Sequence, residues 1–423
     1  MGCGGRLEEF RRRGPAVSGD TLPATPDDHH DGDRAERARI LLETHWRAPG
    51  FCVPNATTYP WQWLWDSCFH SMCWAHLGEP DRAVSELSNL LAHQSPDGFV
   101  PHMTYWDGDT THRQFWRRAA TSSITQPPMY GHAVAQLLRG GVEVPAEVVE
   151  RSRRGLRYLF DTRVRSGGGL VVLHPWESGC DDSPRWDAFA APDEWSFARW
   201  KHRKGELVEG LRFDPVTGSP VGSAHFEVAS VGFNALVAFN AQELADVIGD
   251  EDLAREAAAV VSWLDTRWDG ASSTWIDDVI VGPSLSAGAR TLDALLPVLV
   301  CGDRAVMDVV FDQIRDPAAF GGGCGPAGVH RGEAAFDPRS YWRGPAWPQV
   351  TYLLWLAATR QSRSDDARWL VDRLTTGVDR SGWAEYWHPD TGAGLGAIPQ
   401  SWAALVAVVG GDPPSLSAQA PLA

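Results

Sequence analysis

The connections between the helices that this sequence predicts alternate between short and long. Apolar residues recur with a period of about 3.6, and these stripes predict twelve helices, near residues 34–46, 64–78, 80–94, 122–140, 145–163, 226–248, 251–270, 285–299, 303–315, 341–360, 365–379 and 398–409. After the second, fourth, sixth, eighth and tenth helices, the connection has roughly one to four residues, as is usual between paired helices. Before those helices and before the twelfth, it has from about 14 to about 62 residues.

This alternation predicts an all-α fold of six antiparallel helix pairs in a closed ring, an (α/α)6 barrel. In such a ring the long loops all reach one rim, where a rigid scaffold can position binding and catalytic groups. The alternative is an α-solenoid, but solenoid repeats have a fixed period and no repeat motif recurs here. We therefore expect a barrel over residues 34–412, with residues 185–225 as an inserted, lid-like loop on the rim.

The two ends of the chain lack the helical pattern. Residues 1–33 are rich in Gly, Pro, Asp and Arg, and we expect them and residues 413–423 to be disordered. The N-terminus has no apolar stretch like that of a secretory signal, and no apolar run approaches the roughly 20 residues that cross a membrane. Seven scattered cysteines without a CxxC pair favour a reducing compartment. We expect a cytoplasmic protein.

The composition excludes some partners. The formal net charge of −16 argues against nucleic acid or an anionic membrane, because both bind basic surfaces. No cysteine or histidine spacing typical of a metal site is present, since His29 and His30 lie in the N-terminal tail. We expect neither a metal nor a cofactor. The sequence does not predict the oligomeric state.

Tryptophan is the unusual residue type, with 21 Trp against 7 Tyr. More than half of them fall in the long loops or where those loops enter a helix: Trp61, Trp63, Trp65, Trp106, Trp116, Trp176, Trp186, Trp195, Trp200, Trp275, Trp342, Trp383 and Trp387. The wide apolar ring of tryptophan, with one N–H at its edge, suits the face of a sugar. Asp66, Gln62, Gln126 and Gln400 lie near these aromatic residues and offer partners for hydroxyl groups. The rim is therefore expected to bind a small carbohydrate.

One long loop crowds three carboxylates beside tryptophan. The stretch HPWESGCDDSP, residues 174–184, carries Glu177, Asp181 and Asp182. Apolar and like-charged neighbours favour the protonated form of a carboxyl group, which is the form that the acid of a glycoside hydrolase requires. Spacing alone does not choose among the three.

The loop before the twelfth helix carries a second candidate carboxylate. In SGWAEYWHPDTG, residues 381–392, Glu385 lies between Trp383 and Trp387. Glycoside hydrolysis uses two carboxyl groups on opposite sides of the scissile bond, one protonated and one ionised. Two other functions stay open: a sugar epimerase or isomerase on the same barrel, which would use rim histidines for proton transfer at carbon, and a non-catalytic sugar-binding protein.

These motifs occur in the order found in one known family. The segments YPWQWLWDSCFH, HQSPDGFVPHMTYW, SITQPPMYGHA, HPWESGCDDSPRWD, YWRGPAWPQ and EYWHPDTGAG…PQSW span roughly residues 40 to 410. They resemble glycoside hydrolase family 63, particularly its short bacterial members that hydrolyse glucosylglycerate or mannosylglycerate. The resemblance implies an (α/α)6 barrel, no cofactor, and inverting hydrolysis of a small α-glycoside, either glucosyl- or mannosylglycerate-like or a related α-glucoside.

The resemblance also implies roles for single residues. Asp181 matches the general acid of the family, and Glu385 matches its general base. The pocket for the cleaved sugar is similar at Trp65, Asp66, Trp342, Trp347 and Gln400. The positions that close the site or reach the leaving group are similar at Tyr59, Trp63, Gln126 and Tyr341.

The chain departs from the family pattern in two places. Asp182 stands where the family usually has Asn, which adds a charge beside Asp181. Residues 185–225 lack the arginine-containing segment expected of the glycerate hydrolases. The candidates in that loop to meet an acidic aglycone are Arg199, Arg203, Lys204 and Arg212. Each of them is expected to be a solvated surface charge.

Overall fold

The structure is a computed structural model that describes residues 31–106, 112–190, 195–283 and 289–410. This part of the chain is mostly helical, as the sequence predicts. Its α-helices are α2 (Asp31–His45), α3 (Leu64–His76), α4 (Pro80–Ala92), α5 (Arg113–Trp116), α6 (Tyr130–Arg139), α7 (Ala146–Thr162), α8 (Phe197–Glu209), α9 (Val231–Ile248), α10 (Glu251–Asp265), α11 (Arg304–Arg315), α12 (Pro348–Arg360) and α13 (Ser364–Ser381). Its 3₁₀ helices are η1 (Pro175–Ser178), η2 (Pro184–Phe189), η3 (Leu292–Leu299) and η4 (Ser401–Ala407).

The connections contain short strands that pair two by two, all antiparallel. The pairs are β1 (Trp46–Arg47) with β2 (Phe51–Cys52), β3 (Gln62–Trp63) with β4 (Met103–Thr104), β5 (Arg165–Ser166) with β6 (Gly169–Leu170), β7 (Leu211–Phe213) with β8 (Pro220–Ser223), β9 (Glu227–Ala229) with β12 (Asp278–Val281), β10 (Trp268–Asp269) with β11 (Thr274–Trp275), and β13 (Tyr386–Trp387) with β14 (Gly394–Leu395). They stiffen the loops without forming a larger sheet among the residues described.

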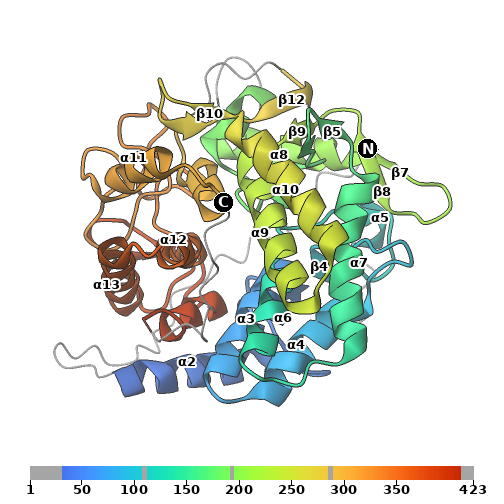
Figure 1. Cartoon of the computed structure of the whole chain (residues 1–423), viewed down its shortest axis with the longest axis horizontal. Coiled ribbons are helices and arrows are strands. Elements are labelled where there is room, and N and C mark those ends of the chain that lie inside the picture. The colour runs from blue at the N-terminus through green and yellow to red at the C-terminus, as the bar shows by residue number, and fades with distance from the viewer. Residues whose placement is uncertain (1–30, 107–111, 191–194, 284–288, 411–423) are drawn as a thin grey trace.

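Six helical elements contact one another in succession. The order of contact is α3, α6, α9, η3, α12 and η4, and η4 contacts α3 again. Each of them also has an outer helix packed on it: α4 packs on α3, α7 on α6, α10 on α9, α11 on η3, α13 on α12, and α2 on η4. Figure 1 follows this course from the blue and cyan helices α2–α4, through green α7 and yellow α10, to the orange and red helices α11–α13.

Burial separates the helices into two classes. Helices α3, α9 and α12 bury nearly every residue, whereas α7, α10, α11 and α13 each bury one stripe. A helix that is apolar all round lies inside a protein, and an amphipathic helix lies at its surface. The core therefore forms around α3, α9 and α12, and the amphipathic helices cover it.

Two of the predicted long helices begin later than the sequence pattern suggested. The helix predicted over 122–140 begins at Tyr130, because Pro127 and Pro128 interrupt the backbone pattern before it. The helix predicted over 341–360 begins at Pro348, a residue suited to the first helical position. Trp342 before it has a φ of 56°, which a right-handed helix does not allow.

Other predicted helices are shorter than the sequence pattern indicates, or are 3₁₀ helices instead of α-helices. The C-terminal part of the segment 285–299 is the 3₁₀ helix η3, which contains Pro297, whereas residues 284–288 lie outside the described residues. The segment 398–409 contains the 3₁₀ helix η4. The helix predicted from 226 begins at Val231, after strand β9. The helix predicted over 251–270 ends at Asp265.

The segment 185–225, predicted as a lid-like loop, is largely regular. It contains most of η2, helix α8 and the β7–β8 hairpin, and its residues 191–194 lie outside the described part. The Ser196 side chain caps α8 by accepting a hydrogen bond from the Arg199 amide. Trp200, Lys204 and Leu207 then bury one face of the helix. The prediction missed α8 because its apolar stripe is interrupted by a lysine.

The predicted tails fall mostly outside the described residues, which begin at Asp31 and end at residue 410. Helix α2 already begins at Asp31, within the tail predicted over 1–33. Among the described helices, none has the length and apolar character of a membrane-spanning segment.

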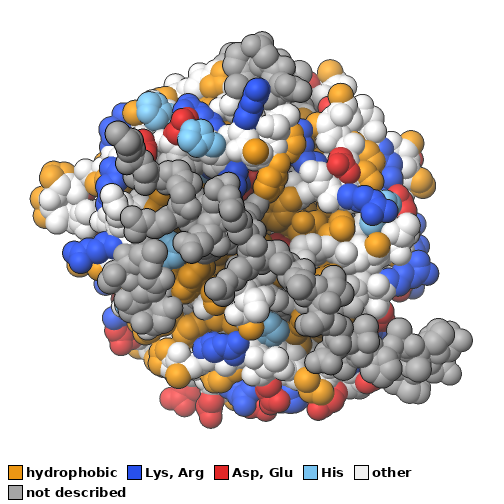
Figure 2. Space-filling view, turned by 180° about the vertical axis from the view of Figure 1, so that it is seen from behind, with side chains coloured by type: hydrophobic (Ala, Val, Ile, Leu, Met, Phe, Trp, Pro, Cys, Tyr) orange, Lys and Arg blue, Asp and Glu red, His pale blue; other side chains and the backbone are white. Residues whose placement is uncertain are grey.

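The surface carries few large apolar side chains in the described residues. Those that are exposed are Ile40, Val164, Phe197, Val216, Ile280, Val309 and Ile398. Figure 2 shows the face opposite to that of Figure 1, where hydrophobic side chains gather towards the middle and charged side chains are frequent around the edge.

Candidate active site

The turn that follows β6 packs its backbone against the predicted sugar pocket. His174 Nδ1 accepts the Trp176 amide hydrogen over 3.1 Å and starts η1. Gly179 then reverses the chain with a φ of 78°, a conformation that favours glycine. A Cβ atom on Gly179 would lie 2.8 Å from the ring of Trp65. The glycine therefore allows the turn to approach Trp65 closely.

Glu177, the first carboxylate of this turn, is fully engaged in a structural ion pair. Its two oxygens accept hydrogen bonds from the two terminal nitrogens of Arg163, each over 2.8 Å. They also accept the amide hydrogens of Thr125, over 3.1 Å, and Leu173, over 2.7 Å. Arg163 and Glu177 are both buried. With both oxygens occupied by N–H donors, Glu177 fixes the loop, and this geometry removes it from the candidate acids.

Asp181 and Asp182 share a buried lysine. Lys204 Nζ donates to Asp181 Oδ2 and to Asp182 Oδ1, and all three residues are buried. The expectation that Lys204 is a solvated surface charge is therefore wrong. The cause is α8, which turns Lys204 and Trp200 towards the same turn, where Trp200 Nε1 donates to the Asp181 carbonyl over 2.9 Å.

The three other cations considered for this segment, Arg199, Arg203 and Arg212, lie nearer the surface, whereas Arg185 is buried and paired with Asp277 and Asp293. Arg199 is exposed, and Arg203 pairs with Glu206 over 2.7 Å. Arg212 pairs with Glu227 over 2.7 Å while 57% of its side chain stays exposed. An exposed pair such as Arg203–Glu206 contributes little stability, whereas Glu227, the partner of Arg212, is buried.

The electrostatics of the turn favour one proton on the aspartate pair. Burial, and then the negative charge of Asp181, raise the pKa of Asp182 to about 7, although Lys204 opposes the shift. Burial lowers the pKa of Lys204, but the two carboxylates more than offset that and leave it raised. Lys204 is therefore cationic at neutral pH, whereas the two aspartates compete for ionisation.

Glu385, on the second loop, is held at both of its oxygens. Tyr59 donates its hydroxyl hydrogen to Glu385 Oε1 over 2.9 Å, and the Ala397 amide donates to Oε2 over 2.8 Å. Gly396 makes this possible, since a Cβ atom there would lie 2.4 Å from Glu385 Oε2. The β13–β14 hairpin thus presents a buried carboxylate in a fixed orientation.

The two loops meet at Tyr341. Tyr341 is half-buried, and desolvation is the first cause of its raised pKa. The negative charges of Asp181 and Glu385 add to the effect. Burial, and to a smaller extent Glu385, likewise raise the pKa of Asp66. The structure therefore brings Asp66, Asp181 and Glu385, from three distant segments, to one neighbourhood.

Aromatic rings line this neighbourhood. Trp342 and Trp347 stack with their ring centres 3.7 Å apart, and Trp347 stacks on Tyr386 at 4.5 Å. The Tyr341 ring meets Trp347 edge to face at 5.3 Å. Rigid aromatic faces of this kind suit the apolar face of a sugar ring.

The other predicted binding residues join the same cluster. Gln126 accepts the Trp65 amide hydrogen over 3.4 Å, and Trp63 meets the Tyr59 ring edge to face at 5.7 Å. The Gln400 amide donates to the Trp383 carbonyl over 2.8 Å. The candidate residues thus lie in connected loops at one place.

Gln62, by contrast, is occupied structurally. Its Oε1 accepts from Trp106 Nε1 over 2.6 Å, and its Nε2 donates to Ser67 over 3.0 Å. The prediction that it binds a sugar hydroxyl is therefore not supported by its hydrogen bonds.

Several candidate residues carry buried polar atoms that find no hydrogen-bond partner within the described ranges. They are Trp63 Nε1, Asp66 Oδ1, Trp342 Nε1, Trp347 Nε1 and Gln400 Oε1. Buried polar atoms are nearly always paired, so a group of unpaired ones calls for an explanation. Acceptors and donors of hydrogen bonds both occur, as the hydroxyl groups of a sugar would require.

The comparisons with known proteins bear on this geometry. Over residues 59–403, the sequence matches the mannosylglycerate hydrolase MGH1-like glycoside hydrolase domain family. The chain belongs to this glycoside hydrolase family.

Its relatives cover nearly the same length. A mannosylglycerate hydrolase of Rubrobacter radiotolerans is 28% identical over 431 residues, covering 88% of this chain and 96% of the relative. A glucosylglycerate hydrolase of Mycolicibacterium hassiacum is 29% identical over 415 residues, covering 82% of this chain and 90% of the relative. These relatives and the family match confirm the resemblance seen in the motifs.

The fold is shared with a solved structure. The family 63 mannosylglycerate hydrolase of Thermus thermophilus, in complex with Tris and D-glycerate, superposes with a TM-score of 0.76 at 24% identity. The alignment covers 89% of this chain and 99% of that one. This likeness agrees with the all-α fold class predicted from the sequence.

One further cluster has metal-ligating side chains. Cys52, His70 and Glu86 are buried, and their potential ligand atoms lie within 4.8 Å of one another. Burial raises the pKa of Glu86 to about 8 and lowers that of His70 to about 3. Both groups are therefore uncharged at neutral pH, and the cluster is held by hydrogen bonds such as Cys52 N–H to Glu86 Oε1, over 2.6 Å.

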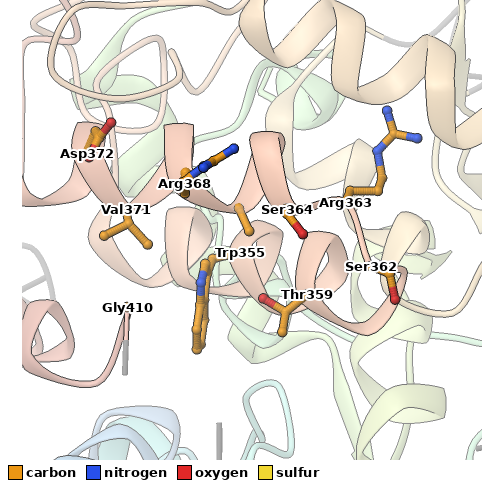
Figure 3. Close-up of a pocket in the computed structure, with 10 residues that line it drawn as sticks. Trp355, Thr359, Ser362, Arg363, Ser364, Arg368, Val371, Asp372 and Gly410 are labelled. Carbon is orange, nitrogen blue, oxygen red and sulfur yellow. The ribbon is translucent and has the colours of Figure 1, made fainter. Parts of the chain in front are cut away.

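Figure 3 shows a separate pocket of about 370 Å³ beside α12 and α13. Trp355, Arg363, Arg368 and Asp372 are among the residues that line it. The lining contains no candidate residue of the hydrolase site, and it involves the C-terminal part of α12, whereas Trp347 precedes the helix. We assign this pocket no role in the chemistry.

Sequence reasoning missed two features of this glycoside hydrolase site. The Arg163 partner of Glu177 lies 14 residues before it, and Lys204 lies 23 residues after Asp181. Neither pairing has a local signature. The one available signal was the spacing of Trp200 and Lys204, four residues apart on one helical face.

Proposed function

We propose that this protein is an inverting hydrolase of a small α-glycoside, with Asp181 as general acid and Glu385 as general base. The observation that carries the proposal is that these two buried carboxyl groups both act on Tyr341, whose ring centre lies 5.5 Å from that of Tyr386, the chain neighbour of Glu385. They come from loops 204 positions apart in the chain. Asp181 contacts the ammonium group of Lys204, whereas Glu385 accepts hydrogen bonds from the Tyr59 hydroxyl and the Ala397 amide. Two carboxyl groups in different environments are what general acid–base hydrolysis uses.

In this mechanism Asp181 gives its proton to the glycosidic oxygen as the bond from that oxygen to the anomeric carbon breaks. A water molecule attacks the anomeric carbon from the opposite face, and Glu385 accepts the proton that the water loses. The products are the free sugar, inverted at the anomeric carbon, and the aglycone alcohol. The two carboxyl groups then need a separation of about 6.5–9.5 Å to leave room for the water.

We propose a sugar subsite formed by Trp65, Asp66, Trp342, Trp347 and Gln400. The unpaired polar atoms of Asp66, Trp342, Trp347 and Gln400 support it, because sugar hydroxyls would satisfy them. Tyr59, Trp63, Gln126 and Tyr341 would then lie beside the leaving group. Glucose and mannose differ at one hydroxyl, and the substrate screen described below distinguishes them.

The relatives support a glycerate aglycone. Two of them are named for the hydrolysis of mannosylglycerate and glucosylglycerate, and the solved structure holds D-glycerate. We therefore propose glucosyl- or mannosylglycerate, or a closely similar α-glucoside, as the substrate.

We propose that the fold is an (α/α)6 barrel over residues 34–412, with residues 185–225 as a lid-like insertion. The cyclic order of contacts from α3 to η4, each element covered by one further helix, supports the barrel. The contact of α8 with the Asp181 turn supports placing the insertion over the site. The cytoplasm remains the proposed location.

Epimerisation is disfavoured by the histidines near Asp181. His102 Nδ1 is engaged with Ser122 over 2.6 Å, and His174 is engaged at both nitrogens, by Lys204 O and the Trp176 amide. Burial lowers the pKa of each histidine to about 3. Such histidines are poor at exchanging protons at neutral pH.

The experiment is a substrate screen with the purified protein. Glucosylglycerate, mannosylglycerate, trehalose and short α-glucans are incubated in turn, and the products are identified by NMR. Release of free sugar from a glycerate glycoside supports the proposal. An epimerised but intact substrate, or binding of a glycoside without turnover, would instead establish one of the other two functions.

A further inference from the structure

Lys204 is an unusual residue in this fold. It exposes 4% of its surface, and lysine is rarely buried to this extent unless its charge is paired. Its ammonium group contacts Asp181 Oδ2 and Asp182 Oδ1. It also lies 5.6 Å from the ring centre of Trp176 and 6.0 Å from that of Trp200. The charge is therefore enclosed by two carboxylates and two aromatic rings.

We propose that Lys204 and Asp182 form a positioning pair for the general acid, in which Lys204 holds Asp181 and Asp182 balances the charge of Lys204. The inference rests on the proposed function, because it gives Asp181 the role of acid. Lys204 and Asp182 act through Asp181 and are positioning residues.

The geometry fixes the orientation of the Asp181 carboxyl group. Lys204 Nζ and Trp176 Nε1, the latter over 3.0 Å, both donate to Asp181 Oδ2. An oxygen that accepts two N–H donors is disfavoured as the site of an O–H group. Oδ2 therefore stays an acceptor, and the two donors fix the direction in which the carboxyl group points.

Charge balance explains why the two residues occur together. Lys204 alone would favour the ionised form of Asp181 and weaken it as an acid. Asp182 alone would place a second buried negative charge beside the first. With both present, the ammonium group can hold Asp181 in place while the second carboxylate keeps it able to take up a proton.

The titratable groups that interact electrostatically with Asp181 include His102, His174, Tyr341 and Cys180, the chain neighbour of Asp181. The charged groups beyond them are Glu385, which acts on Tyr341, and Arg185 and Asp293, which act on Cys180. Burial lowers the pKa of His102 and His174 to about 3, and it raises the pKa of Cys180 and Tyr341 well above their usual values. All four stay neutral between about pH 5 and 8. A titration of activity on the alkaline side therefore reports the aspartate pair.

The test is the pH dependence of kcat/KM for hydrolysis of the glycoside that the substrate screen identifies. Loss of activity on the alkaline side reports deprotonation of the general acid. Asp182→Asn removes a negative charge and leaves Lys204, so the alkaline limb of the kcat/KM pH profile should move to lower pH by roughly one unit or more. Lys204→Met removes the positive charge, so the limb should move to higher pH while kcat falls.

Two further variants separate charge from packing. The double variant D182N/K204M should return the alkaline limb towards that of the wild type, because both charges are gone. Lys204→Arg keeps the charge and should hold the limb near its original position. Arg199→Met, on an exposed position of the same helix, should leave the limb unchanged.

The outcomes are distinct. Opposite shifts in the single variants, cancelled in the double variant, support the positioning pair. An Asp182→Asn limb that stays in place, or that moves to higher pH, overturns it, even if Lys204→Met does not fold. If the wild type hydrolyses no glycoside, or Asp181→Asn retains full activity, the proposed function itself has failed.

Discussion

The hydroxyl of Tyr59 donates a hydrogen bond to Glu385 Oε1 over 2.9 Å, joining positions 326 residues apart in the chain. The second oxygen of Glu385 accepts the Ala397 amide hydrogen over 2.8 Å. With one donor on each oxygen, the carboxylate has a fixed orientation. A general base gains rate from such orientation, because the attacking water must be aligned with the anomeric carbon.

Replacement of Tyr59 by Phe should therefore lower kcat by about tenfold or more, with the fold intact. Steady-state kinetics on the identified glycoside measures the effect. Tyr158→Phe is the matched control, because it also removes a hydroxyl hydrogen bond, to the Pro220 carbonyl over 2.7 Å, but far from Glu385 in the chain. The control should change thermal stability and leave kcat close to that of the wild type. Equal kinetics in both variants would contradict an orienting role for Tyr59.

Substrates with different leaving groups distinguish the role of the acid from that of the base. Asp181→Asn should lower kcat by about 10²–10⁴ on a glycoside with a poor leaving group. It should lose much less on a glycosyl fluoride, whose leaving group needs no proton. Glu385→Gln should be impaired on both substrates, because each requires an activated water. The reverse pattern would exchange the two roles.

The ion pair of Glu177 and Arg163 should contribute to stability. Glu177→Gln leaves a buried guanidinium without its charge partner, which costs about 3–5 kcal/mol in the free energy of unfolding. Urea denaturation measures it. Asp252→Asn is the control, since Asp252 and Arg255 form a surface pair with side chains 67% and 70% exposed, worth about 1 kcal/mol or less. If Glu177→Gln had normal stability and no activity, Glu177 would become a candidate acid again.

The buried histidines predict a loss of stability in mild acid. Burial lowers the pKa of His70, His102 and His174 to about 3, so each stays neutral in the folded protein down to that pH. In the unfolded chain each takes up a proton below about pH 6.5. Each histidine therefore makes its full contribution to the free energy of unfolding above about pH 6.5. Below that pH the contribution falls by up to about 1.4 kcal/mol per pH unit.

Urea denaturation at several pH values between 5 and 7.5 checks this slope. His70→Gln should flatten it by the contribution of one group, whatever its effect on the stability at pH 7.5. A slope that is the same in wild type and His70→Gln would mean that His70 is not held neutral by burial.

The sequence predicted the family, the helical fold class and the loops that hold the candidate residues, because these depend on periodicity and on motifs of adjacent residues. It placed several helix starts too early, since the apolar stripe continues through Pro127 and Pro345 although the backbone cannot. It also missed the environment of Lys204. Whether a lysine is solvated or buried depends on partners brought together by packing, and no local pattern records that.

The most direct measurement is the anomeric configuration of the first sugar released, followed by proton NMR during hydrolysis of glucosyl- or mannosylglycerate. Inversion by Asp181 and Glu385 predicts that the β-anomer forms first and the α-anomer appears later by mutarotation. Initial formation of the α-anomer would contradict the assignment of Glu385 as a base that activates water.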